Sequence, residues 1–146
     1  MSVTQHSRKD NPLAQRGVLL TGLRVFALLS VLNVVLQGVS AGEVLMRNHT
    51  ALTLHETGAI VIHVLAGITA VLAALIWFST RRGLWSVVVA TLVFIATFVQ
   101  AAYGHGRTLY IHVPLAMLIT VGAVWLLTWS WTGAGRPADA AAHGGR

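Results

Sequence analysis

Four long apolar stretches, separated by short polar or glycine-containing segments, dominate the pattern of the chain. They cover about Val18–Val39, Leu54–Phe78, Leu84–Ala102 and Leu109–Trp129. About 20 consecutive apolar residues are needed to cross a bilayer as a helix, and each stretch approaches or exceeds that length. The connections are short, apart from a predicted loop over Ser40–Thr53. The pattern predicts an all-α fold, an integral membrane four-helix up-down bundle in which the second and fourth helices lie on a diagonal.

The two ends of the chain differ from this apolar interior. Residues 1–16 are mainly polar, and residues 133–146 are rich in glycine and alanine. Such compositions cannot bury enough apolar surface to fold, so both ends are predicted to be disordered tails. The four-helix transmembrane domain is predicted to occupy residues 17–132.

Composition excludes several classes of protein. The 146 residues are 55% hydrophobic and 10% charged, with a mean hydropathy of +0.73, which a soluble domain of this size could not cover with polar surface. The absence of cysteine excludes disulfides, thiolate metal sites, iron–sulfur clusters and covalently attached haem. The net charge of +6 is scattered over connections and tails, which predicts contact with lipid headgroups and no binding of nucleic acid.

The distribution of Lys and Arg between the connections predicts an orientation. Only Arg47 and Arg107 lie in the second and fourth flanks, whereas seven basic residues lie in the others: Arg8, Lys9, Arg16, Arg81, Arg82, Arg136 and Arg146. Cytoplasmic flanks carry the excess of Lys and Arg. The sequence therefore predicts a multi-pass protein of the cell inner membrane with both termini in the cytoplasm.

The two halves of the chain resemble each other, which indicates an internal two-helix repeat. Residues Val35–Gly38 match Phe98–Ala101, and Ile62–Val64 match Ile111–Val113. The repeat superposes Gln37 on Gln100 and His63 on His112. Because 25 residues separate Gln37 from His63 and only 11 separate Gln100 from His112, the first half is predicted to carry an insertion in its outer loop.

His63 and His112 are the main candidates for chemistry. Each lies about 17–19 residues from the inner end of its span, so the two are predicted to share one depth on diagonal helices, which is the arrangement of two axial ligands on one haem iron. Small residues on the face of His63 leave room for a flat macrocycle; they are Ala59, Ala66, Gly67 and Ala70. The alternatives are other metal or proton chemistry, or hydrogen bonds that only stabilise the bundle.

A second polar layer lies farther out along the same helices. His55 precedes His63 by eight residues and His105 precedes His112 by seven, with Glu56 and Arg107 beside them. These side chains could receive haem propionates, bind another metal or line an entry for an electron partner. A His55–His112 pair is the alternative to His63–His112, but His55 is estimated to lie about 12 Å nearer the outer surface than His63.

The buried amides Gln37 and Gln100 must be hydrogen-bonded in lipid, either to a neighbouring helix or to the edge of a ligand. Met117 is a further candidate axial ligand, ranked below His63 because it lies more than one turn beyond His112.

With this histidine pattern, residues 18–129 resemble one half of the haem A synthase family, whose eight helices form two similar four-helix halves with paired histidines on the second and fourth helix of each. More broadly, the chain resembles small four-helix b-type cytochromes. The resemblance implies axial roles for His63 and His112. It also implies that a chain of half the family's length would have to dimerise to rebuild the whole architecture.

These observations predict a membrane protein that binds one haem b between its second and fourth helices and has an electron-transfer, redox or haem-related role. No nucleophile–base pair, paired carboxylates or phosphate-binding glycine loop is present for hydrolytic or transferase chemistry. The rival interpretations are a cofactor-free accessory or assembly subunit of a larger membrane complex, and an outer-face histidine site for a metal such as copper or zinc.

Overall fold

The computed structural model describes residues 12–133, which form four long helices and no strand. Helix α1 spans Pro12–Leu45, α2 spans His49–Thr80, α3 spans Leu84–Ala102 and α4 spans Leu109–Thr132, with a short 3-10 helix, η1, at Gly106–Thr108. All four long helices have the length and apolar composition needed to cross a membrane, as expected of a multi-pass membrane protein.

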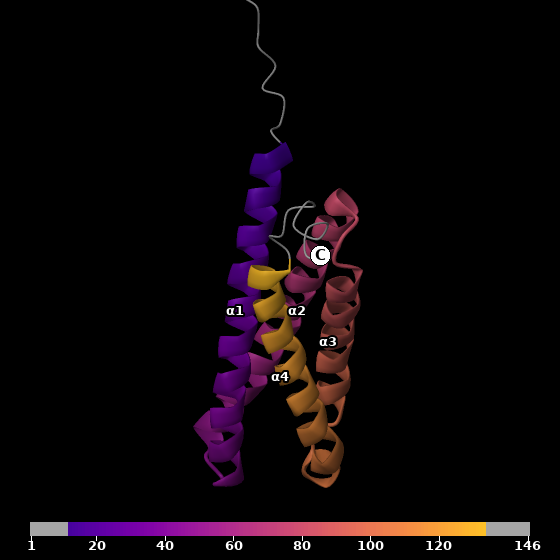
Figure 1. Ribbon diagram of the computed structural model, residues 1–146. Coiled ribbons are helices and arrows are strands. Elements are labelled where there is room, and N and C mark those ends of the chain that lie inside the picture. The colour runs from indigo at the N-terminus through magenta and orange to yellow at the C-terminus, as the bar shows by residue number, and fades with distance from the viewer. Residues whose placement is uncertain (1–11, 134–146) are drawn as a thin grey trace, which may run out of the picture.

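The helices run alternately up and down (Figure 1). Close backbone contacts join α1 to α2, α2 to α3, α3 to α4 and α4 to α1, whereas none joins the diagonal pairs of long helices. The predicted all-α up-down bundle, with α2 and α4 on a diagonal, is therefore confirmed. In Figure 1 the α1–α2 hairpin and the α3–α4 hairpin lie close together over much of their length and diverge toward the end where each hairpin turns.

The predicted loop over Ser40–Thr53 is wrong, because most of it is helical. Helix α1 continues to Leu45 and α2 begins at His49, so that only residues 46–48 connect them. Asn48 caps α2, and its side-chain oxygen accepts hydrogen bonds from the backbone N–H groups of Thr50 at 3.1 Å and Ala51 at 3.3 Å. The extra residues of the first half therefore lengthen two helices instead of forming a loop.

The domain boundary at the N-terminus also moves. Helix α1 begins at Pro12, so residues 12–16, which were predicted to belong to a tail, are helical. Proline suits this position because the first turn of a helix has no partner for its N–H groups. The rest of the two predicted tails, residues 1–11 and 134–146, lies outside the described residues.

The centre of the bundle is closed by small side chains. Each helix contributes an alanine that is at most 2% exposed: Ala27, Ala73, Ala90 and Ala123. Larger apolar residues complete the packing around them, among them Leu23, Ile76 and Leu126. Only a void of about 10 Å³ remains at this level. Small residues bring helix backbones close together, which is how helices associate in lipid, where burial of apolar surface gives no net driving force.

Five hydroxyl side chains are buried in this core, and each is satisfied within its own helix or turn. The side chains are Ser30, Thr69, Ser86, Thr97 and Ser130, and each donates to a backbone carbonyl three or four residues earlier. These hydroxyls therefore take up little space and need no partner from a neighbouring helix.

Arg24 is the charged side chain that lies deepest in α1, and it reaches the end of α4. Its Nε donates to the carbonyl of Ser130 at 3.2 Å, and its guanidinium lies 4.2 Å from the centre of the Trp131 ring. A cation is favoured beside the unpaired carbonyls at a helix C-terminus and over an indole face. Arg24 therefore links the first helix to the last at the end opposite the divergent one.

The turn between α2 and α3 depends on Gly83. This residue has a φ of +80°, and a Cβ added to it would lie 2.5 Å from the ring of Trp129. Both the left-handed conformation and the close approach of the indole therefore require the absence of a side chain.

We expect Gly83→Ala to lower the free energy of unfolding by about 1–3 kcal/mol, because the new methyl group is disfavoured at positive φ and overlaps Trp129. Thermal unfolding in detergent, followed by circular dichroism, measures the change. Gly17→Ala is the matched control, since nothing lies within 4 Å of its Cβ position in α1. Equal losses in the two variants would contradict the role assigned to Gly83.

Candidate functional site

A cavity of about 270 Å³ lies between the four helices, next to the end where the hairpins diverge. Every long helix contributes to its wall. The polar part of the lining consists of Gln37 from α1, His55 and His63 from α2, Thr97 and Gln100 from α3, and His112 and Thr120 from α4. The cavity thus gathers three of the seven histidines and both glutamines that the sequence singled out.

The imidazole rings of His55 and His112 face each other across this cavity. Their centroids are 6.2 Å apart, and their planes are inclined at 52°. His55 is on α2 and His112 on α4, so the pair bridges two diagonal helices whose backbones make no close contact. The structure therefore brings together the alternative pair, and the expected match in depth between His63 and His112 does not hold.

That expectation was counted from the inner ends of the spans. Such a count gives equal depth only for helices that are inclined alike, whereas the two hairpins diverge here. Once α2 begins at His49 and α1 extends to Leu45, both helices reach farther outward than the apolar stretches indicate. His55 then lies in the second turn of α2, at the level of His112 in the first turn of α4. His63 lies eight residues farther along α2, or about 12 Å.

Hydrogen bonds fix the tautomer of both rings. His112 Nδ1 lies 2.9 Å from the carbonyl oxygen of Gln100, so it must carry the proton and donate it. His55 Nδ1 lies 3.0 Å from Ser40 Oγ, whose own proton is directed to the oxygens of Gln37. When that proton is given to Gln37, His55 Nδ1 is also the donor. In both rings Nε2 keeps its lone pair, which is the state required of a metal ligand.

Gln37 and Gln100 hold corresponding positions around these histidines. The Gln37 side chain donates to the carbonyl of His55 at 3.1 Å, whereas Gln100 uses its carbonyl to accept from the His112 ring. In space each glutamine is thus joined to one member of the facing pair. The two contacts differ in kind, since Gln37 uses its side chain and meets the His55 backbone, whereas Gln100 uses its backbone carbonyl and meets the His112 ring.

His63 occupies the wall between the cavity and the surface of the bundle. Its Nδ1 donates to the carbonyl of Ala59 in the preceding turn, and its ring meets the edge of Phe98 with centroids 4.3 Å apart. It also lines an open apolar groove of about 520 Å³ between α2 and α3, together with Phe94 and Phe98. Its Nε2 is left available, as in the other two histidines.

The predicted stripe of small residues is divided between the cavity and the core. Ala59 lines the cavity. Ala66 packs against Val93 and Ile119, Gly67 faces Phe94 in the α2–α3 groove, and Ala70 lies against the central cluster. Three of the four positions therefore serve helix packing.

The outer residues of the prediction lie away from the cavity. Glu56, His105 and Arg107 are exposed, with His105 preceding η1 and Arg107 within it. Within residues 12–133, no group of three His, Cys, Asp or Glu side chains could hold a metal ion.

Sequence reasoning missed the small residues that shape the cavity and the serine that orients His55. Gly38, Ala41 and Ala101 line the wall. Gly38 and Ala101 each follow a glutamine of the internal repeat, which is the signal that could have located them. Nothing in the sequence indicates Ser40, because its contact with His55 depends on how α1 and α2 are aligned.

No family model matches the chain, and no similar protein was found among curated sequences or solved structures.

Gly58 is required by the position of Gln37. A Cβ at residue 58 would lie 3.0 Å from the side-chain carbon and oxygen of the Gln37 amide. We expect Gly58→Ala to displace this amide and break its bond to His55, which lowers the free energy of unfolding by about 1–3 kcal/mol. Thermal unfolding in detergent tests this.

Gly22→Ala is the control for Gly58→Ala, because its added Cβ would meet only Leu72 at an ordinary distance of 3.5 Å. If Gly58→Ala were as stable as this control, Gln37 would not be held against α2 in the way described.

Proposed function

We propose that the chain is an integral membrane b-type cytochrome that holds one haem between α2 and α4, with His55 and His112 as axial ligands. The observation that carries the proposal is the facing pair of imidazoles 6.2 Å apart. Imidazole nitrogens bind metals such as zinc at about 2.0–2.1 Å, and a similar bond on each side of one ion puts the ring centroids about 6.4 Å apart. The two free Nε2 atoms are the donors that this arrangement needs.

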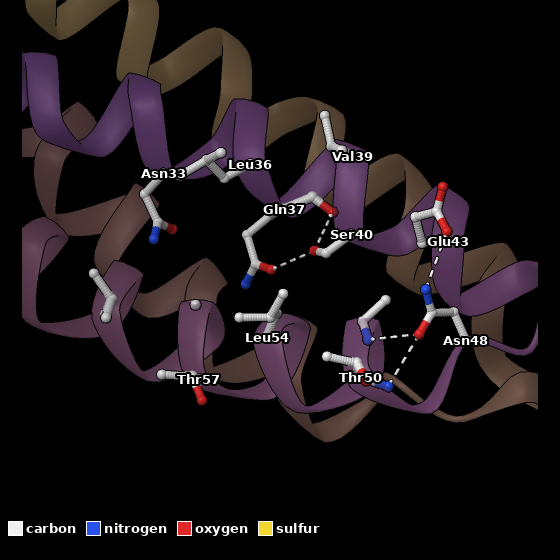
Figure 2. A pocket seen from close by; sticks show the side chains of 13 residues that line it. Asn33, Leu36, Gln37, Val39, Ser40, Glu43, Asn48, Thr50, Leu54 and Thr57 are labelled. Atoms are coloured by element: carbon white, nitrogen blue, oxygen red, sulfur yellow. Dashed lines mark hydrogen bonds between the residues drawn. The ribbon is translucent and has the colours of Figure 1, made fainter.

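The residues of the cavity suit a flat apolar group. Small side chains, among them Gly38, Ala59 and Ala116, line it, and no charged side chain does. Its volume of about 270 Å³ is slightly below the range of ligand sites, which begins at about 300 Å³. Two residues of its wall are shared with neighbouring hollows, however. Gln37 also lines a groove between α1 and α2 (Figure 2), and His63 also lines the α2–α3 groove. A macrocycle edge would extend toward these openings.

A bound haem supplies one-electron exchange between ferric and ferrous iron. The chain's own part is to orient and to insulate. Ser40 and the Gln100 carbonyl hold the rings of His55 and His112 through Nδ1, which fixes the direction of each Nε2. The apolar wall keeps water away, and a low-dielectric surrounding influences the reduction potential. These features favour electron transfer over substrate chemistry.

Location and partners form part of the same proposal. Arg16, Arg81 and Arg82 lie at one end of the bundle, and Arg47 and Arg107 lie at the other. Together with the basic residues of the tails, this supports a multi-pass protein of the cell inner membrane with both termini in the cytoplasm and the cavity toward the outer face. The resemblance to half of haem A synthase supports a homodimer or a larger membrane complex.

Purified protein is expected to be red, with a Soret band and sharp bands on reduction. His55→Ala and His112→Ala should each abolish or strongly alter these bands, because each removes an axial nitrogen. His49→Ala, which changes an exposed histidine at the start of α2, should leave them intact. Absorption spectroscopy of the four proteins checks this.

Other results would favour other interpretations. A colourless preparation from haem-replete cells would support the cofactor-free subunit, and metal without a porphyrin spectrum would support a histidine metal site. Loss of the bands in His63→Ala but not in His55→Ala would transfer the second axial role to His63.

Ser40→Ala should keep the bands but weaken haem binding by about 10–100-fold, since it removes the partner that orients His55. Haem titration of apoprotein measures the change. Ser79→Ala is the control, because Ser79 donates only to a carbonyl of its own helix. Identical affinities in the two variants would show that Ser40 does not position the ligand.

A further inference from the structure

Positive charge gathers at the end of the bundle opposite the histidine cavity. In the part of the chain that the structure describes, four arginines lie there: Arg16, Arg24, Arg81 and Arg82. The two acidic residues among the same described residues, Glu43 and Glu56, lie at the other end. The arginines therefore have no carboxylate beside them within this part of the chain, and the end they occupy attracts anions from outside it.

Arg24 is held more firmly than the exposed Arg81 and Arg82. It is partly buried, its Nε is bound to the Ser130 carbonyl, and its guanidinium lies 4.2 Å from the centre of the Trp131 ring. Its other two nitrogens, Nη1 and Nη2, have no hydrogen-bond partner among the described residues. Two parallel N–H donors on one planar group match two oxygens of one phosphate. Because the side chain is already ordered, little conformational entropy is lost when an anion binds.

The level of Arg24 along the bundle is that of a lipid headgroup. Arg24 lies twelve residues after Pro12, about 18 Å along α1, yet it contacts the last turn of α4. In Figure 1 the start of α1 and the turn between α2 and α3 stand beyond the end of α4. Trp131 is 63% exposed here, and tryptophan is enriched where the hydrocarbon of a bilayer meets the headgroups. A phosphate bound to Arg24 therefore lies where lipid phosphates lie.

We propose that Arg24 and Trp131 form a binding site for one anionic phospholipid, whose phosphate is bound by Nη1 and Nη2 of Arg24. The acyl chains extend from there over exposed apolar side chains deeper in the bundle, among them Leu28 of α1 and Val124 of α4. These surfaces favour a lipid over a free phosphate ion, which gains nothing from them. The site does not rest on the proposed function, because it lies at the opposite end from the histidine cavity.

Lipid binding can be measured with the full chain in a mild detergent by native mass spectrometry, in which each bound lipid adds its own mass. The probe is dioleoyl phosphatidylglycerol. The wild type should bind one copy more tightly than any further copies. Arg24→Gln should weaken this first binding at least about tenfold, the factor that one charge-assisted hydrogen bond supplies. Arg82→Gln makes the same change of charge at the same end and should leave the first binding within about twofold of the wild type.

Trp131→Leu tests the site without changing the charge or the Ser130 carbonyl. It removes the ring against which the guanidinium lies, and we expect the first lipid to bind about two- to fivefold more weakly. Trp85→Leu is the matched control, because Trp85 is 74% exposed at the start of α3, at the same end of the bundle. Thermal unfolding in the same detergent identifies the variants that fold, and Trp131→Leu decides the question if Arg24→Gln does not.

Four results would overturn the proposal. Wild-type binding by Arg24→Gln would show that Arg24 only links α1 to α4, and equal losses in Arg24→Gln and Arg82→Gln would show attraction to the net charge alone. Equal affinity for dioleoyl phosphatidylcholine, which carries the same phosphate with an added positive charge, would exclude a preference for anionic lipid. Displacement of the lipid by excess inorganic phosphate would show that the acyl chains contribute nothing.

Discussion

The close approach of four helices at one level, where each contributes an alanine, is the constraint on which the rest of the structure depends. In lipid, apolar side chains gain nothing by leaving their surroundings, so helices associate where backbones can come near enough for dense contact. Ala27, Ala73, Ala90 and Ala123 meet this condition. The void at that level is only about 10 Å³, so the four helices are packed tightly together there.

The cavity is a consequence of this tight packing at one level. From it the two hairpins diverge, so small residues beyond the centre do not meet but line an open space instead. The histidines and glutamines are gathered around this space, whereas the buried hydroxyls of the core are satisfied within their own helices or turns. The hydrogen bonds that Ser40 and Gln100 accept from histidine rings also differ in kind from the core hydroxyls, because they join neighbouring helices. The site is thus held by hydrogen bonds within each hairpin, one between α1 and α2 and one between α3 and α4.

Hydropathy was enough to predict the four helices and their order, because a bilayer requires long apolar segments with internal hydrogen bonding. It could not locate the helix ends. Residues Ser40–Leu45 and His49–Thr53 are too polar to count as membrane-spanning, yet they contain no proline to stop a helix, and Asn48 provides a cap. His63 was matched with His112 by counting from the inner helix ends, and that count does not register the divergence of the two hairpins. The contacts of Ser40 depend on the alignment of α1 with α2, which no local pattern reveals.

The division of the facing histidines between the two hairpins has a consequence for how the protein is made. His55 belongs to the hairpin that leaves the ribosome first, and His112 to the one that follows. Neither half alone brings two imidazoles together, so a complete site can arise only after the last helix has been inserted and has joined the others. A group that needs both rings can therefore be bound only once α4 has joined the other helices, and it would tie together the ends of the hairpins that the alanine contacts leave apart.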